Sequence, residues 1–390
     1  MKFDPLPWPG HPTIARAVRM PSHIALLGNF PPRRCGIATY TEDSWLALKA
    51  QTPAPRVDVY AMDDGQVEGY GPDITRLIPQ DDVAAYHAAA DAIDASGAQI
   101  LWVQHEFGIF GGESGSFVLG IVNRVKIPVA VTLHTILETP NGSQRSVLEA
   151  LLDRAAIVIV MAEKGREILE RVYAVDPAKV SVIPHGIPDR PQGDATASRA
   201  KLGMPERPTI LTFGLLSPDK GIADMIEAMP AIRSACPDAH YIVLGATHPH
   251  LVRHAGETYR ETLVARVAEL GLQDNVSFVD RFVELDELTE WLTAADVYVT
   301  PYRNPAQITS GTLSYAIGLG KAVVSTPYVH ATEILSDDHG RLVAFRSPEA
   351  LATAVGGLLT DTQDRAQMSA RAYARGRTMT WPRNAEAVLA

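Results

Sequence analysis

The sequence predicts an α/β fold made of two doubly wound, Rossmann-like domains that face each other across a deep cleft. Short apolar runs alternate with helical segments almost throughout the chain, which is the pattern of parallel sheets covered by helices. With 390 residues, the chain is also too long for one ordinary hydrophobic core. The strand candidates fall into two consecutive series, which favours two domains over one large sheet.

The first series of strands lies in the first half of the chain. Its strands are predicted at His23–Gly28, Val57–Met62, Ile100–Gln104, Val129–Leu133, Ile157–Met161 and Val180–Ile183. Helices separate several of them, for example Tyr40–Lys49, Ala84–Ala95 and Gln144–Arg154. We assign residues 1–188 to this first domain.

A polar segment with glycine and prolines, Pro188–Ser198, is predicted to link the two domains. The strands of the second series are predicted at Thr209–Phe213, Tyr241–Leu244, Val276–Val279, Val297–Thr300, Ala322–Ser325 and Leu342–Ala344, with helices such as Ile222–Ala235 and Arg260–Leu270 between them. The second domain is assigned to residues 189–378. A final helix over residues 379–390 ends on apolar Val388 and Leu389, and we expect it to pack back onto the first domain.

Composition narrows the class of protein. The formal net charge is -10 and no long Lys/Arg block offsets it, which argues against nucleic acid as a partner. The two cysteines, Cys35 and Cys236, lie in different predicted domains, so we expect no structural disulfide and a cytoplasmic location. The first residues do not have the pattern of a signal peptide, and no apolar run is long enough for a transmembrane helix. Peripheral membrane contact and the oligomeric state stay open.

Ligands of open parallel sheets bind beyond the carboxyl ends of the strands, so polar residues at these ends are the candidates for a site. The first strand is followed by a loop that contains Arg33, Arg34 and Gly36 and leads into a helix. Two interpretations fit this loop equally well. Gly36 lets the backbone approach a phosphate or a sugar, or the segment is a plain strand-to-helix turn.

Three further strands of the first domain end in histidine. The side chains at these ends are Gln104, His105, Glu106, His134 and His185. One such histidine is usually structural, but three at the same edge of a sheet point to the ligand crevice. Their spacing lacks the short ligand pairs of zinc sites, so we predict no metal. The glycine-rich loop Phe107–Gly115 fits either an acceptor pocket with apolar stacking surface or a hairpin-like structural loop.

In the second domain, the segment Phe213–Gly221 follows the first strand and opens a helix. A lysine at a helix start is unfavourable for the helix dipole unless an anion is present. Lys220 is therefore the best candidate for a phosphate partner, and a solvated surface lysine is the alternative. Further along, QITSGTLSYAIGLGKAVV (307–324) reads as a loop, a short helix and a buried strand. Such a unit aims backbone N–H groups at an anion on the helix N-terminus.

These motifs together resemble the retaining glycosyltransferases of family 4, which have the GT-B fold. The resemblance extends from about Ile24 to Leu342, and its most specific parts are FGLLSPDKG, IPHG, ADVYVTPY and GKAVVSTP. Three positions depart from the family pattern. Leu215 stands where an arginine is usual, and Gln307 and Tyr315 stand where the family has two glutamates.

The resemblance implies transfer of a hexose from a nucleotide-diphosphate sugar to a hydroxyl acceptor, with retention of configuration. In the front-face mechanism proposed for the family, the leaving phosphate takes the acceptor proton, so no metal and no cofactor beyond the sugar nucleotide is expected. The implied catalytic residues are His134, Lys220 and Gln307. The implied donor-binding residues are Gly36, Gly214, Ser217, Lys220, Arg281, Ser310, Gly311, Thr312 and Tyr315. We assign acceptor binding to Gln104, His105, Glu106 and His185.

The departures keep two other functions open. A tyrosine at position 315 is a poor substitute for a carboxylate that accepts two ribose hydroxyls, so a phosphorylase that uses a sugar 1-phosphate also fits. A catalytically silent carbohydrate-binding protein is the third interpretation. The missing charge at Leu215 is expected to come from Arg281 or Arg303. Glu333 either binds a sugar hydroxyl or caps the helix that follows it.

Overall fold

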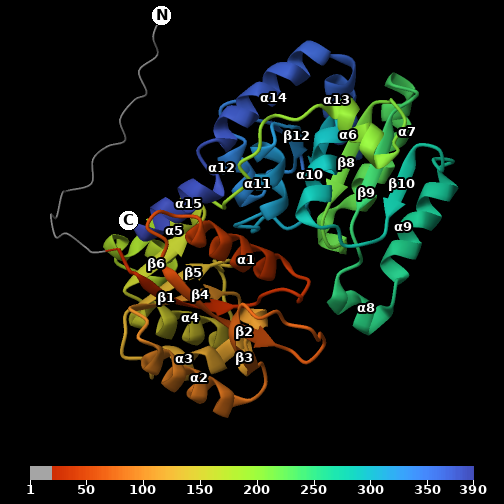
Figure 1. The fold of residues 1–390 in the computed structure, drawn as a ribbon. Helices are drawn as coiled ribbons and strands as arrows, with labels where there is room; N and C mark the ends of the chain where they lie inside the picture. The colour runs from red at the N-terminus through yellow and green to blue at the C-terminus, as the bar shows by residue number, and fades with distance from the viewer. Residues whose placement is uncertain (1–19) are drawn as a thin grey trace, which may run out of the picture.

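The computed structural model describes residues 20–390 and contains two parallel-sheet domains, each covered by helices on both faces (Figure 1). The N-terminal sheet has the strand order β3-β2-β1-β4-β5-β6-β7, and the C-terminal sheet has the order β10-β9-β8-β11-β12-β13. Within residues 20–390, neighbouring strands of both sheets are parallel. The predicted fold class, two doubly wound Rossmann-like domains, is confirmed. The predicted absence of a signal peptide concerns residues outside the described range.

The described part of the N-terminal domain begins with β1, which lies inside the sheet between β2 and β4. Its strands are β1 (His23–Gly28), β2 (Arg56–Asp63), β3 (Ile74–Pro79), β4 (Ile100–His105), β5 (Val129–Leu133), β6 (Ile157–Val160) and β7 (Val180–Val182). Its helices are α1 (Gly36–Lys49), α2 (Val83–Ser96), α3 (Leu119–Val122), α4 (Gly142–Arg154) and α5 (Glu163–Tyr173), with short 3-10 turns η1 (Phe107–Ile109), η2 (Glu113–Val118) and η3 (Pro177–Lys179). The loop 107–115 is therefore helical in its turns, not a hairpin.

The C-terminal domain repeats this plan. Its strands are β8 (Thr209–Phe213), β9 (His240–Leu244), β10 (Val276–Val279), β11 (Val297–Thr300), β12 (Ala322–Ser325) and β13 (Arg341–Leu342). Its helices are α6 (Ala195–Leu202), η4 (Pro218–Lys220), α7 (Ile222–Ala235), α8 (Pro249–Ala255), α9 (Thr258–Glu269), α10 (Leu285–Ala294), α11 (Gly311–Gly318), α12 (Val329–Ile334), α13 (Pro348–Thr360), α14 (Thr362–Gly376) and α15 (Trp381–Leu389).

Local chemistry explains where the helices next to the cleft begin. The Cys35 thiol caps α1 by accepting from the backbone N–H of Ala38, and the Ser310 hydroxyl caps α11 by accepting from the N–H of Leu313 at 3.3 Å. Both caps lie directly after the loop that follows a buried strand. Both helices therefore direct their N-termini toward the carboxyl edge of their sheet.

Helix α15 leaves the second domain and packs on the first. Its buried residues Trp381, Ala385 and Leu389 share a core cluster with Ile24 and Tyr40 of the N-terminal domain. In Figure 1 it lies beside α1, at the join between the two domains. The linker is shorter than predicted, because α6 already begins at residue 195 of the polar segment.

None of the helices within residues 20–390 is long and apolar enough to cross a membrane. Both cysteines are free. The described part of the chain also contains no group of three or more His, Cys, Asp or Glu side chains arranged to hold a metal ion.

Candidate functional site

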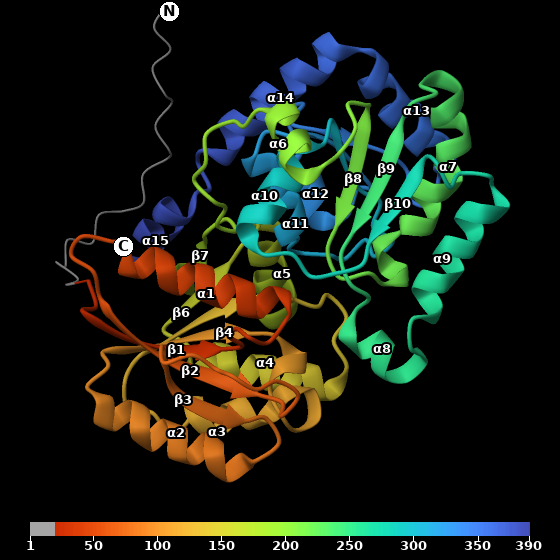
Figure 2. The same ribbon diagram turned by 45° about the vertical axis from the view of Figure 1, so that its right-hand side comes forward.

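Residues of both domains meet at the carboxyl edges of the two sheets. The Tyr40 ring of α1 contacts His134 after β5 and His185 after β7, with ring centroids 4.7 and 5.0 Å apart. His185 lies against α11 of the other domain, because a Cβ atom on Gly311 would come within 3.0 Å of its Nε2. Figure 2 shows α1 between the N-terminal sheet and the second domain. This meeting point of α1, the strand-end histidines and α11 is the candidate site.

Lys220 is the last residue of η4, two residues before α7, and its ammonium lies 3.9 Å from the centroid of the buried Tyr302 ring. The Tyr302 hydroxyl is 2.7 Å from the Thr312 hydroxyl, which is 3.1 Å from that of Ser310. No carboxylate in residues 20–390 forms an ion pair with Lys220. The aromatic face orients this half-buried cation without neutralising it, and an anion near Thr312 would supply the missing charge.

The N-terminus of α11 offers donors beside Lys220. No acceptor in the described chain pairs with the backbone N–H of Gly311 or Thr312. Gly214 approaches this helix end closely, since its Cβ would lie 3.3 Å from the Thr312 methyl carbon, and its φ of +128° favours glycine. The Ser217 carbonyl accepts from the Lys220 N–H at 3.0 Å and so shapes the lysine turn. Free N–H groups at a helix N-terminus next to a cation form an anion-binding arrangement.

The α1 helix presents a second free N-terminus at the cleft. Gly36 is exposed and has open space around its Cβ direction, and no described acceptor pairs with the N–H of Gly36 or Ile37. Of the two neighbouring arginines, Arg33 is held by Asn29, Gln80 and Asp64. Arg34 is exposed, and its guanidinium lies 5.9 Å from the centroid of the Phe282 ring in the other domain.

The two arginines expected to replace the charge missing at Leu215 are both paired with carboxylates. Arg281 bonds Glu287 at 2.7 Å, and Arg303 bonds both oxygens of Asp224 at 2.8 and 2.6 Å. Each pair neutralises the guanidinium locally. The expectation that either arginine supplies the missing charge is therefore not supported by their contacts.

Gln307 is tied to its own loop. Its side-chain N–H donates to the Thr309 carbonyl at 2.6 Å, and its backbone carbonyl accepts from the backbone N–H of His330 at 3.1 Å. The Nδ1 atom of His330 in turn accepts from the Ser310 N–H at 3.0 Å, so the neutral ring carries its proton on Nε2. Burial, and less strongly His185, lower the pKa of His330 to about 3. Sequence reasoning missed His330, which lies in α12 a few residues after the GKAVVSTP segment.

Tyr315 does not present a free hydroxyl to the cleft. Its hydroxyl donates to Oδ2 of Asp43 on α1 at 2.6 Å, and both side chains are buried. Burial raises the pKa of Asp43 to about 6, although the bond from Tyr315 lowers it. The residue assigned to donor binding thus joins the two domains. Sequence reasoning missed Asp43, and an acidic residue on the otherwise buried face of α1 was the available signal.

The strand-end residues of the N-terminal domain differ in access to the cleft. The His134 ring is partly exposed, and its Nε2 donates to the buried Gln104 Oε1 at 3.0 Å. Burial, and less strongly His185 and His105, lower the pKa of His134 to about 3, so it is neutral. The buried His185 places Nδ1 2.7 Å from the Gly186 carbonyl. Burial lowers the pKa of His185 to about 4.

The side chains of His105 and Glu106 contact residues of the loops that follow β4 and β5. The fully buried His105 lies between Phe107 and Phe110, with centroid separations of 5.0 and 6.0 Å. The Glu106 carboxylate accepts from the Thr135 hydroxyl at 2.5 Å and from the Phe107 N–H at 2.9 Å. Both side chains therefore shape the loop after β4, and His134 is the only one of the three strand-end histidines that is partly exposed.

Glu333 has a role that neither expectation foresaw. Its carboxylate accepts from the backbone N–H groups of Glu163 and Lys164 at 2.9 and 3.3 Å. These groups form the first turn of α5, which has no side-chain cap of its own. Glu333 thus caps a helix of the opposite domain and adds a second polar contact between the domains.

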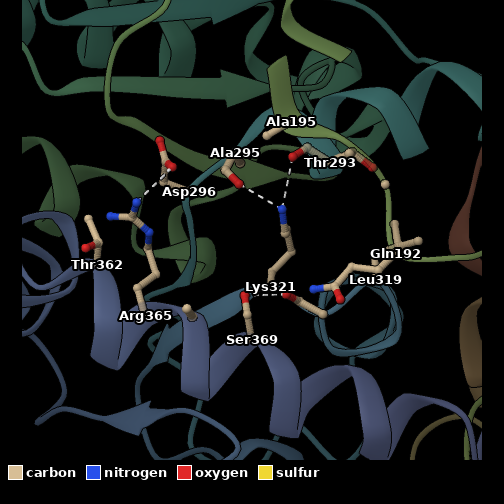
Figure 3. Close-up of a pocket in the computed structure, with 13 residues that line it drawn as sticks. Gln192, Ala195, Thr293, Ala295, Asp296, Leu319, Lys321, Thr362, Arg365 and Ser369 are labelled. Carbon is tan, nitrogen blue, oxygen red and sulfur yellow. Dashed lines mark hydrogen bonds and ion pairs between the residues drawn. The ribbon is translucent and has the colours of Figure 1, made fainter. Parts of the chain in front are cut away.

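A separate cavity of about 230 Å³ lies at the opposite edge of the C-terminal sheet, between the linker, the end of α10 and α14. Figure 3 shows the Lys321 ammonium directed at the carbonyls of Thr293 and Ala295, at 3.0 and 2.8 Å. Arg365 lies 3.5 Å from Asp296. Burial lowers the pKa of Lys321 to about 8. The charged groups of this cavity are satisfied by the protein itself.

Comparison with known proteins gives a consistent class. A model described as Glycosyltransferase Family 4 matches residues 36–190, and one described as Glycosyl transferases group 1 matches residues 207–361. In solved structures, HepE of Anabaena in complex with UDP has a TM-score of 0.73 at 17% identity, with 94% of this chain and 98% of that chain covered. Sucrose-phosphate synthase of Thermosynechococcus elongatus has 0.73 at 19%, with 94% and 97% covered. At these identities the likeness shows the fold.

Two curated relatives illustrate the range. D-inositol 3-phosphate glycosyltransferase of Corynebacterium glutamicum is 28% identical over 280 residues, which are 66% of this chain and 64% of that protein. The match thus spans less than two thirds of that relative's length. A GDP-mannose-dependent alpha-(1-6)-phosphatidylinositol monomannoside mannosyltransferase of Mycolicibacterium smegmatis is 25% identical over 370 residues, which are 88% of this chain and 91% of that protein.

Two models of glycosyltransferase domains thus match the two domains of the chain, and its fold is the GT-B architecture. Both matched domains are consistent with membership of family 4.

Proposed function

We propose that this chain transfers a hexose from a nucleotide-diphosphate sugar to a hydroxyl acceptor, with retention of configuration and without a metal ion. The observation that carries the proposal is Lys220, a half-buried cation without a carboxylate partner in the described chain, beside the free N–H groups of α11. Such a cation needs an anion, and the diphosphate of the donor supplies it. The names of the relatives, which include a GDP-mannose-dependent mannosyltransferase, support this donor class.

In this proposal the donor diphosphate lies between the N-terminus of α11 and the N-terminus of α1. Cleavage of the bond between the sugar and the phosphate builds negative charge on the leaving group, which Lys220 and the four N–H groups of Gly36, Ile37, Gly311 and Thr312 stabilise. The acceptor oxygen forms the new bond to the sugar, and its proton passes to the leaving phosphate. The step needs no carboxylate nucleophile, which agrees with Gln307 and its bond to Thr309.

His134 is the proposed partner of the transferred sugar. Its ring is neutral, partly exposed and held by Gln104, so it can exchange hydrogen bonds with hydroxyls without adding charge. We propose acceptor entry over the loop that follows β4, and we infer an inositol- or glycan-like acceptor from the relatives' names. The free thiols of Cys35 and Cys236 fit a reducing compartment, so we propose a cytoplasmic reaction.

A phosphorylase that uses a sugar 1-phosphate is the second candidate. The observation that favours it is the Tyr315 hydroxyl, which bonds Asp43 and is not free for a ribose. Lys220 and the N-terminus of α11 would hold a single phosphate equally well.

A thermal-shift screen tests the proposal with UDP, GDP, sugar 1-phosphates and orthophosphate as probes, because a ligand that binds only the folded state raises the melting temperature. Stabilisation by a nucleoside diphosphate, followed by turnover of its sugar conjugate, is the expected result. Stabilisation by phosphate and sugar 1-phosphate alone would replace the transferase by the phosphorylase. Sugar binding without turnover of any donor would identify a silent binding protein. The anomeric configuration of the product, read by NMR, tests retention.

A further inference from the structure

We propose that the hydrogen bond between Tyr315 and Asp43 is a positioning element that aligns the N-termini of α1 and α11 on either side of one anionic ligand. The inference rests on the proposed function, since it concerns the same diphosphate. It adds two residues that work through the backbone N–H groups they place, without touching the ligand.

The position of the bond within the two helices carries the argument. Asp43 lies seven residues after Gly36 and Tyr315 lies four residues after Gly311. At about 1.5 Å per residue, the bond is about 10 Å along α1 and about 6 Å along α11 from their first residues. In both helices, the free N–H groups therefore lie only a short distance along the helix from this bond. A shift of the bond therefore moves both anion-binding ends relative to each other.

The Tyr315–Asp43 bond and the aromatic rings around it favour one alignment of α1 relative to α11. The two side chains are 272 residues apart in sequence and join the domains at 2.6 Å. The Tyr315 ring lies 6.1 Å from that of His185, and His185 also contacts Tyr40 and Trp381, at 5.0 and 5.8 Å. An apolar contact at this place would tolerate sliding of one helix along the other, whereas a buried hydrogen bond of this length fixes one alignment.

The Glu333 cap on α5 makes the bond's role more specific. This second contact also holds the domains together, but it lies at the start of α5 and not on either anion-binding helix. Loss of the Tyr315–Asp43 bond would therefore leave the domains connected while it frees α1 relative to α11. The expected consequence is weaker anion binding in a folded protein, not separation of the domains.

The test uses the full chain and inorganic pyrophosphate as the probe, with affinity measured by calorimetry. Tyr315→Phe removes the donor and should weaken pyrophosphate binding by about tenfold or more, because misalignment of preorganised groups is costly. Asp43→Asn keeps an oxygen acceptor for the Tyr315 hydroxyl and should bind within about threefold of the parent. This rescue by the conservative variant separates alignment from a charge effect.

Tyr241→Phe is the matched control for Tyr315→Phe, and a double variant covers the case in which Tyr315→Phe does not fold. Tyr241→Phe removes a buried tyrosine bond to Thr212, 3.0 Å long, inside the second domain, and should leave pyrophosphate affinity unchanged. If Tyr315→Phe does not fold because it strands the Asp43 carboxylate, Asp43→Leu combined with Tyr315→Phe removes the charge and both polar groups. This pair should fold and still bind pyrophosphate weakly.

The outcomes separate the inference from the proposed function. Binding of pyrophosphate by the parent, together with equal binding by Tyr315→Phe or by the apolar pair, would overturn the positioning role and leave the donor site intact. A parent that binds neither pyrophosphate nor any nucleoside diphosphate would overturn both.

Discussion

Two lysines at opposite edges of the C-terminal sheet have opposite surroundings. Lys220 follows β8 at the carboxyl edge, where it contacts an aromatic face and no described carboxylate. Lys321 precedes β12 at the amino edge, where it donates to two backbone carbonyls at the end of α10. The cavity beside Lys321 has a volume of about 230 Å³, whereas a pocket lined by Lys220 has about 10 Å³.

Polar groups without a partner in the described chain therefore locate the site better than cavity volume does. The Lys321 ammonium satisfies the orphan carbonyls of a helix C-terminus, which is a structural task completed without a ligand. In the described chain, the Lys220 ammonium has no carboxylate partner and the N–H groups of Gly311 and Thr312 have no acceptor. An anion at the carboxyl edge therefore gains more interaction energy, because the cation and N–H groups there are unpaired, than a ligand in the cavity beside Lys321.

Replacement of Lys321 should destabilise the second domain without affecting anion binding. Lys321→Met keeps the length of the side chain but leaves the carbonyls of Thr293 and Ala295 without their donor. Each unsatisfied buried group costs about 1–3 kcal/mol, so the free energy of unfolding should fall by about 3 kcal/mol. Urea denaturation measures this, and UDP or pyrophosphate affinity should stay unchanged below the transition. A stable variant with weakened anion binding would reverse the roles of the two lysines.

The second prediction concerns Asp43, a buried group whose ionised carboxylate destabilises the folded state. Its pKa in the folded protein, about 6, lies above the ordinary 3.8. The folded state therefore binds the proton more tightly, and the stability that Asp43 contributes is greatest in acid and is lost as the pH rises from about 4 to about 6. Asn does not titrate, so Asp43→Asn should gain about 2–3 kcal/mol relative to the parent between these limits.

Urea midpoints of parent and Asp43→Asn, taken at several pH values, measure this change. All other titrating groups cancel in the difference between the two proteins. A difference that does not vary with pH would show that the carboxyl titrates near its ordinary value.

The sequence predicted much of the fold because most strands are short, largely apolar runs. β1, β5, β8, β10, β11 and β12 have the predicted bounds. β3 was missed because it is an edge strand with mostly exposed residues, among them Thr75 and Arg76, so its sequence lacks an apolar run. The linker was predicted too long because polar residues at the start of α6 resemble a loop, although Asp194 caps that helix.

Features of the site formed by one segment could be predicted from the sequence, whereas contacts formed between the two domains could not. The motif around Lys220 and the start of α11 can be read from spacing, because each lies directly after a strand. The Asp43–Tyr315 bond and the Glu333 cap join residues 272 and 170 positions apart. Helical spacing within one segment carries no information about such contacts, so Tyr315 was assigned to the donor instead of to Asp43.

Replacement of Lys220 should weaken donor binding without affecting the fold. Lys220→Ala should fold normally, because the ammonium makes no described ion pair whose partner would be stranded. A hydrogen bond to a charged group contributes about 1.5–3 kcal/mol, so donor affinity should fall roughly 10- to 150-fold. Calorimetry with the nucleoside diphosphate found in the screen measures it. Lys321→Met is the matched control for the loss of one positive charge, and affinity within about twofold of the parent would remove Lys220 from the site.

The smallest expected effect is that of a chelator. If Lys220 and two helix N-termini neutralise the leaving diphosphate, a divalent cation has no charge left to balance at that place. The cleft residues support this, since His134, His185 and His330 bond Gln104, Gly186 and Ser310 and do not converge on a common point as metal ligands do. Turnover should therefore stay within experimental error in excess EDTA. A loss of activity that Mg²⁺ or Mn²⁺ restores would show that the diphosphate needs a cation besides Lys220, and it would weaken the contrast between the two edges of the sheet.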